Sequence, residues 1–397
     1  MKKGKNIVAG ILSFGIFLIF FFAVQRLVTP KYATDLPEGN FTAEYYDETT
    51  LHDVILIGDC EVYENIDPIR LWSEYGITSY IRGNAQQLAW QSYYMLEDTL
   101  RYETPKVVIY NVQALIHDKP QKEEYNRMTL DGMPWSAAKW KAVETSLCEG
   151  EKFLDYVFPV LRYHQRISEL KKEDFTYFKK RKKVSHNGYY MRIDVLPVSE
   201  SEVADIHWIP GWDKDSDTQE DDSLVIDDPW GEIEKAHVDE PELQSGNLAD
   251  EREGEAFGSK PMEYLDKIRS LCEEKGIQLI LMKAPSLAPR WYESDNIQVE
   301  EYADKHHLPY INFYELLDET GLDYEKDTYD GGLHMNLSGA DKLTVYLGSI
   351  LERDYHMPDH RGEPSYASVY EQKEAFYQDM IAAQQSELKR YGEIRSY

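Results

Sequence analysis

Five short apolar runs alternate with helical segments along this chain, and the alternation limits the fold more than any other feature. The runs lie at residues 54–57, 77–81, 106–111, 277–282 and 310–313. Runs of this length bounded by turn residues are typical of buried strands. Strands that alternate with helices form a parallel sheet, and near-continuous apolar strands indicate that helices cover both faces. We therefore predict an α/β protein with a three-layer α/β/α domain.

Helix signals follow most of these runs. Asp67 and Pro68 form a typical helix start, and Gly76 a typical stop. Ser338 is expected to cap a last helix of this domain from Gly339 to Leu351. The other predicted helices cover residues 86–100, 153–178, 264–275, 299–306 and 366–391.

The N-terminus carries a membrane signal. Lys2, Lys3 and Lys5 precede an uncharged, mostly apolar run over residues 7–24. At about 1.5 Å per residue these 18 positions span roughly 27 Å, enough for a bilayer core. A cleaved signal peptide is the alternative, but no small-residue cleavage site follows the run. We expect a single-pass signal-anchor in the cell membrane and, from the N-terminal lysines, an extracytoplasmic main domain, although Arg26 and Lys31 weaken this asymmetry.

The predicted organisation follows from these signals. It consists of a cytoplasmic N-terminus (1–6), a transmembrane signal-anchor (7–25), a linker (26–48), the α/β domain (49–355) with an acidic insertion (199–259), and a polar C-terminal extension (356–397).

The chain is strongly acidic. Its formal net charge is −29, so nucleic acid is excluded as a partner because that needs a basic surface. Residues 200–255 hold 20 acidic and 3 basic residues, a local charge of −17, and are expected to be disordered. An EF-hand is rejected there, since Thr218 and Leu224 occupy the positions that need Gly and Glu. Loose binding of divalent cations by this tract is the remaining alternative, and no resident cofactor or metal is expected.

Three cysteines do not form a disulfide framework, because an odd number leaves at least one without an intramolecular partner. Cys272 is expected in a helical core, and Cys148 has no evident partner. Cys60 follows the first apolar run directly, after Gly58 and Asp59. The carboxyl ends of strands in open α/β sheets are where chemistry is usually found.

A second set of polar residues is expected at the same edge. His334, in the loop before the last helix of the domain, is a candidate base for a Cys60 nucleophile, with Asp330 as its orienting partner and Asp327 as the alternative. The backbone N–H of Cys60, together with Gly83 and Asn111 at the ends of the next two strands, is a candidate oxyanion hole. The alternatives are a space-filling Cys60 and a His334 that packs at the helix start.

These residues resemble the SGNH/GDSL hydrolase superfamily. Gly58-Asp59-Cys60 corresponds to the first block, Gly83 to the second, Asn111 to the third, and Asp330 with His334 to the last. The sequence from His334 to Lys342 is similar to membrane-anchored cell-surface members of Gram-positive bacteria, of the DltD-like and polysaccharide O-acetylation type. The resemblance implies a flavodoxin-like fold and esterase or acyl-transfer chemistry on cell-envelope polysaccharides or teichoic-acid-like polymers. It also implies partnership with a membrane-bound O-acyltransferase.

Two departures from this pattern separate the functional hypotheses. Cys60 stands where the family has Ser, and Gly331 stands three residues before His334, where the family usually has Asp. A Cys-His-Asp set can still perform acyl transfer, because a thiolate is a good nucleophile. The alternatives are a non-catalytic envelope assembly factor that binds polysaccharide or the acyltransferase, and redox sensing by Cys60.

Overall fold

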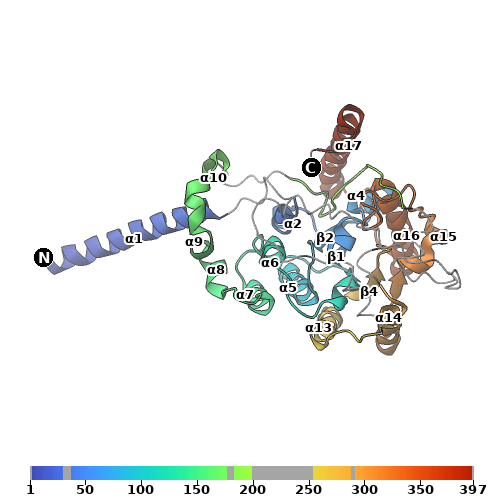
Figure 1. Ribbon diagram of the computed structural model, residues 1–397, viewed down its shortest axis with the longest axis horizontal. Coiled ribbons are helices and arrows are strands. Elements are labelled where there is room, and N and C mark those ends of the chain that lie inside the picture. The colour runs from blue at the N-terminus through green and yellow to red at the C-terminus, as the bar shows by residue number, and fades with distance from the viewer. Residues whose placement is uncertain (1, 30–36, 177–182, 199–253, 288–290, 396–397) are drawn as a thin grey trace, which may run out of the picture.

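A five-stranded parallel sheet forms the centre of the computed structural model, which describes residues 2–29, 37–176, 183–198, 254–287 and 291–395 (Figure 1). The strand order is β2-β1-β3-β4-β5. The strands are β1 (Val54–Gly58), β2 (Ser79–Gly83), β3 (Val107–Asn111), β4 (Gln278–Lys283) and β5 (Tyr310–Asn312). The predicted parallel α/β sheet is thus confirmed. Because β2 and β3 flank β1 on opposite sides, the direction in which successive strands are added to the sheet reverses at β1. Open α/β sheets bind their ligands at such a point.

Helices cover both faces of the sheet. Val54 and Leu56 of β1 join one core cluster, and Ile55 and Ile57 join the other. The first cluster contains residues of α4 (Pro68–Tyr75), α16 (Leu337–Tyr355) and α17 (Pro364–Tyr391). The second contains residues of α5 (Ala89–Thr99), α13 (Ser259–Lys275) and α14 (Glu293–His306). The strands read as continuous apolar runs because both sets of side chains are buried.

Helix ends agree with the sequence in one case and differ in another. Asp67 caps α4 by accepting hydrogen bonds from the backbone N–H groups of Ile69 and Arg70, and Gly76 ends it with φ 69°. The predicted Ser338 cap of α16 is wrong. Asn336 is the cap and accepts from the N–H groups of Ser338 and Gly339, so the helix starts earlier.

The stretch between β3 and β4 contains several short helices. They are η3 (Val112–Ile116), α6 (Glu123–Leu130), α7 (Ala137–Ser146), α8 (Phe153–Val157), α9 (Pro159–Tyr163), η4 (His164–Glu169) and α10 (Lys172–Thr176). The single helix predicted over 153–178 is therefore wrong. Pro159 lacks an N–H and begins a new helix instead of continuing the old one. Most of the acidic insertion, residues 199–253, lies outside the described residues.

The N-terminal part of the chain contains one exposed and one buried helix. Helix α1 (Lys2–Val28) is apolar and exposed from Ile7 to Phe22, consistent with a signal anchor or a signal sequence. Residues 26–48 are predicted from the sequence to be a linker. Within them, α2 (Glu38–Glu44) is buried and is followed by η2 (Tyr45–Asp47). Asn84 at the end of β2 donates to the Glu38 carbonyl at 2.9 Å, so α2 is part of the folded domain.

Four short elements complete the fold: α3 (Cys60–Tyr63), η6 (Phe313–Leu316), α15 (Leu317–Thr320) and the loop at residues 183–198. This loop lies along the edge strand, since the N–H of Ile81 donates to the Asn187 carbonyl at 2.9 Å. The Arg192 carbonyl accepts from the N–H of Leu337 at the start of α16. The loop therefore joins β2 to the region around His334.

The C-terminal helix α17 is also a structural part of the domain. The Tyr370 ring stacks on Trp72 of α4 at 3.9 Å, and the Tyr377 hydroxyl donates to the Asp67 carboxylate at 2.5 Å. We expect Tyr370→Ala to lower the free energy of unfolding by about 3–5 kcal/mol, because it removes a fully buried ring. Urea unfolding followed by circular dichroism measures this change.

Tyr391→Ala, at an exposed position of the same helix, is the matched control and should change stability by less than about 0.5 kcal/mol. Equal effects of the two substitutions would contradict the packing of α17 on α4.

Candidate active site

The turn after β1 places Cys60 at the carboxyl edge of the sheet. Asp59 caps α3 by accepting from the Glu61 N–H at 3.2 Å, and Cys60 is the first residue of that helix. A Cβ atom on Gly58 would lie 2.6 Å from Val62 Cγ2 and 2.8 Å from Asn111 Cβ. Only glycine fits there, and this close packing defines where Cys60 stands. Cys60 is partly exposed and has no disulfide partner.

Gly83 and Asn111 lie on opposite sides of this turn. A Cβ atom on Gly83 would lie 3.1 Å from the Gly58 carbonyl oxygen, so the two backbones approach closely. The Asn111 amide nitrogen donates to the Asp59 carboxylate at 3.2 Å and to the Glu61 carboxylate at 3.0 Å. Both amide hydrogens of Asn111 are thus engaged, and its role in an oxyanion hole stays a prediction.

His334 and Asp330 form a close pair. The ring Nδ1 of His334 lies 2.6 Å from Asp330 Oδ2, and the His334 N–H donates to Asp330 Oδ1 at 2.8 Å. Gly331 and Gly332 have φ values of 74° and 89°, which let the loop turn back so that a carboxylate four residues earlier reaches the ring. Asp327, the other candidate, bonds to the Asp323 N–H and to Lys342 instead.

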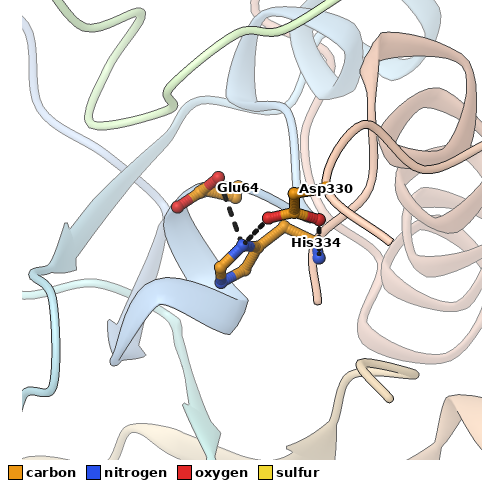
Figure 2. A group of neighbouring side chains, drawn as sticks. All are labelled: Glu64, Asp330 and His334. Atoms are coloured by element: carbon orange, nitrogen blue, oxygen red, sulfur yellow. Dashed lines mark hydrogen bonds and ion pairs between the residues drawn. The ribbon is translucent and has the colours of Figure 1, made fainter. Parts of the chain in front are cut away.

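Glu64 is a second carboxylate beside His334 and was not identified from the sequence. Its Oε2 lies 3.6 Å from His334 Nδ1, and Figure 2 shows Glu64 and Asp330 both facing this nitrogen. The Tyr329 hydroxyl donates to Glu64 Oε2, whereas Glu64 Oε1 is buried with no hydrogen-bond partner in the described part of the chain. The sequence feature that points to Glu64 is its position four residues after Cys60, which places both on the same side of a short helix.

Charge and burial act together on the Cys60–His334 pair. Burial raises the pKa of the Cys60 thiol to about 11, although the positive charge of His334 opposes this. Burial alone would lower the pKa of His334, but Glu64, Asp330 and Cys60 together raise it well above its usual range. At neutral pH the resting state is therefore a thiol beside an imidazolium.

A buried ion pair between Lys283 and Glu61 lies next to the turn that carries Cys60. Lys283, at the end of β4, lies 2.8 and 2.9 Å from the two Glu61 oxygens and donates to the Ala284 carbonyl at 2.7 Å. Burial and the neighbouring Glu61 charge raise the pKa of Asp59 to about 7. Lys283 therefore partly compensates two buried carboxylates directly under the Cys60 turn.

Glu64, Asp330 and His334 also form a group with donor atoms within 4.8 Å of one another, as a metal site would need. The 2.6 Å between Asp330 Oδ2 and His334 Nδ1 is a hydrogen-bond distance. It is shorter than the roughly 3.3 Å between two tetrahedral ligands that each lie about 2 Å from a shared ion. We therefore interpret the two carboxylates as partners that orient the imidazole and stabilise its charged form.

This interpretation predicts how the two carboxylates affect His334. Asp330→Asn and Glu64→Gln should each lower the pKa of His334, by about 1–3 pH units for Asp330→Asn, because each removes a negative charge beside Nδ1. The measurement is an NMR titration of the ¹⁵N-histidine-labelled chain, with the His334 signal assigned by its loss in His334→Gln. Asp327→Asn is the matched control and should leave the pKa of His334 unchanged. A result in which Asp327→Asn acts and Asp330→Asn does not would overturn the assignment.

Comparisons with protein-family models, curated proteins and solved structures give no match to this chain. The structure alone therefore defines the fold, which is a five-stranded parallel α/β domain with an exposed apolar N-terminal helix.

Proposed function

We propose that this chain is an SGNH-like acyl-transfer or ester-hydrolysis enzyme with Cys60 as nucleophile. The observation that carries the proposal is the Asp330–His334 pair, whose charge acts on the Cys60 thiol at the carboxyl edge of the sheet. The three residues stand in the order orienter, base and nucleophile that nucleophilic catalysis of acyl transfer requires.

The wider arrangement supports the same family. The strand order 2-1-3-4-5 is that of flavodoxin-like sheets, the fold that the resemblance implies. Gly83 and Asn111 adjoin the Cys60 turn, as the second and third blocks of the resemblance would require. Asp330 sits one residue further from His334 than the family pattern, yet the Gly331-Gly332 turn brings it to the ring.

The proposed reaction begins with His334 in its neutral form. With Nδ1–H donated to Asp330, Nε2 carries the lone pair and accepts the Cys60 proton as the sulfur attacks the ester carbonyl carbon. The oxyanion is held by backbone N–H groups of Cys60 and Gly83. The carbon–oxygen bond then breaks, the alcohol leaves with the proton from His334, and a thioester remains on Cys60. Water or a polymer hydroxyl gives a proton to His334, attacks the thioester, and regenerates the thiol when that proton returns to sulfur.

The substrate class that we propose is an acyl ester of a cell-envelope polysaccharide or teichoic-acid-like polymer. Helix α1 as an uncleaved anchor would place the domain on the extracytoplasmic side of the cell membrane. A membrane-bound O-acyltransferase is the proposed partner, as the resemblance to membrane-anchored SGNH proteins implies.

A second candidate is a non-catalytic assembly factor that binds the polymer or the acyltransferase. The engagement of both Asn111 amide hydrogens with Asp59 and Glu61 favours it, because this leaves the amide without a hydrogen for an oxyanion.

The kinetic test uses p-nitrophenyl acetate with the full chain in detergent. Cys60→Ala and His334→Ala should each lower the rate at least ~100-fold, because they remove the nucleophile and its base. Cys148→Ala is the matched control, since it removes another partly exposed free thiol, and should retain the wild-type rate.

The wild-type rate should rise as the pH increases above 7. The pKa of His334 lies well above 6.5, so a higher pH produces more of the neutral imidazole that accepts the thiol proton. Equal rates for wild type and Cys60→Ala would contradict the enzymatic proposal and favour the assembly factor.

A further inference from the structure

The base of α1 is held by a group of short helices. We call the segment Phe153–Thr176, which comprises α8, α9, η4 and α10, the collar. Phe21 of α1 packs edge-on against Phe158 at 5.9 Å. Gln25 accepts from the Val160 N–H at 2.9 Å, and Arg166 donates to the Val28 carbonyl at 2.8 Å. In Figure 1 the collar runs across the end of α1, between this helix and the main domain.

The collar exposes large apolar side chains. Leu154, Leu161, Ile167 and Phe175 are each between 52% and 59% exposed. At one end, the exposed Trp140 packs against Phe153 at 4.2 Å. Large apolar side chains that are exposed repeatedly along one segment indicate a binding surface, and tryptophan is typical of membrane–water interfaces.

The length of α1 favours lipid as the occupant. Its apolar part runs from Ile7 to Val24, which is about 27 Å at ~1.5 Å per residue, and Phe21 within this part contacts Phe158 of the collar. Gln25 and Val28 are buried by their packing in the protein. A hydrocarbon core of about 30 Å would therefore reach the level at which Phe158 contacts α1. Interfacial helices bury their apolar face by about 5–10 Å at the boundary between headgroups and acyl chains, which is where this contact would lie.

The charge of the collar differs from that of the rest of the chain. Phe153–Thr176 holds four basic and four acidic residues and is therefore neutral, within a chain of net charge −29. Lys171 and Lys172 are exposed, and Arg162, which pairs with Glu123, is 46% exposed. A neutral segment with exposed basic side chains can approach lipid headgroups without the repulsion that a strongly acidic surface would meet there.

We propose that the collar lies in the membrane interface, with Leu154, Leu161, Ile167 and Phe175 among the headgroups and upper acyl chains of the lipids. It rests on the proposed function of α1 as an uncleaved anchor. The anchor would then cross the bilayer while the collar lies along its surface. The two contacts together would hold the main domain in one orientation on the membrane. An interface with another membrane protein is the competing occupant.

The test places the photo-crosslinker benzoylphenylalanine in the full chain, reconstituted in nanodiscs of phosphatidylglycerol and phosphatidylethanolamine. The substituted positions are Leu161 and Ile167 in the collar, Phe17 in α1, and Ile297 as an exposed apolar control on α14. After illumination, mass spectrometry counts lipid adducts at each position. We expect adducts at positions 17, 161 and 167 at several times the yield at position 297.

Two outcomes would overturn the proposal, and they differ from each other. Adducts at position 17, with positions 161 and 167 no higher than 297, would reject the collar and leave the anchor intact. No adducts at position 17 would reject the anchor and the collar together. The same substitutions in cell membranes identify the competing occupant, since protein adducts in place of lipid adducts at positions 161 and 167 would also overturn the proposal.

Discussion

The hydrogen bond between Asp330 and His334 is the interaction on which the candidate site depends. It fixes the imidazole with Nδ1 turned to the carboxylates, and in the proposed reaction Nε2 accepts the proton of the Cys60 thiol. The Gly331-Gly332 turn makes this bond geometrically accessible. The Met335 N–H donates to the Asn65 side chain just after α3 at 2.8 Å, which ties the histidine loop to the helix that carries Cys60.

Buried acidity distinguishes this site from a simple Cys-His pair. Burial raises the pKa of Glu38, Asp59 and Glu64 to about 7 each, so their protonation changes near neutral pH. Lys283 is the buried cation that offsets part of this charge beneath the site, and His334 is the cation within it. A protonated His334 is thus favoured at rest, and the proposed reaction requires this proton to leave before the thiol can be activated.

The sheet could be predicted from sequence because buried parallel strands are apolar on both faces. The placement of Cys60, Gly83 and Asn111 at one edge could also be predicted, because each lies at or just after the carboxyl end of one of the first three strands. Loop geometry could not be predicted: whether Asp330 or Asp327 meets His334 depends on two glycines with positive φ, and Asn336 rather than Ser338 caps α16. Glu64 was missed because its contact with His334 joins residues 270 positions apart, and the local spacing from Cys60 shows only that Glu64 lies near the thiol, not that it meets the histidine.

The most direct test of the central claim is the identity of the acylated residue. The full chain is incubated with p-nitrophenyl acetate at pH 8, quenched in acid and digested, and the peptides are measured by mass spectrometry. The account predicts one acetyl group on Cys60, removable by hydroxylamine as a thioester, and its absence when His334 is replaced by alanine. Acetylation of lysine or serine with an unmodified Cys60 would contradict it.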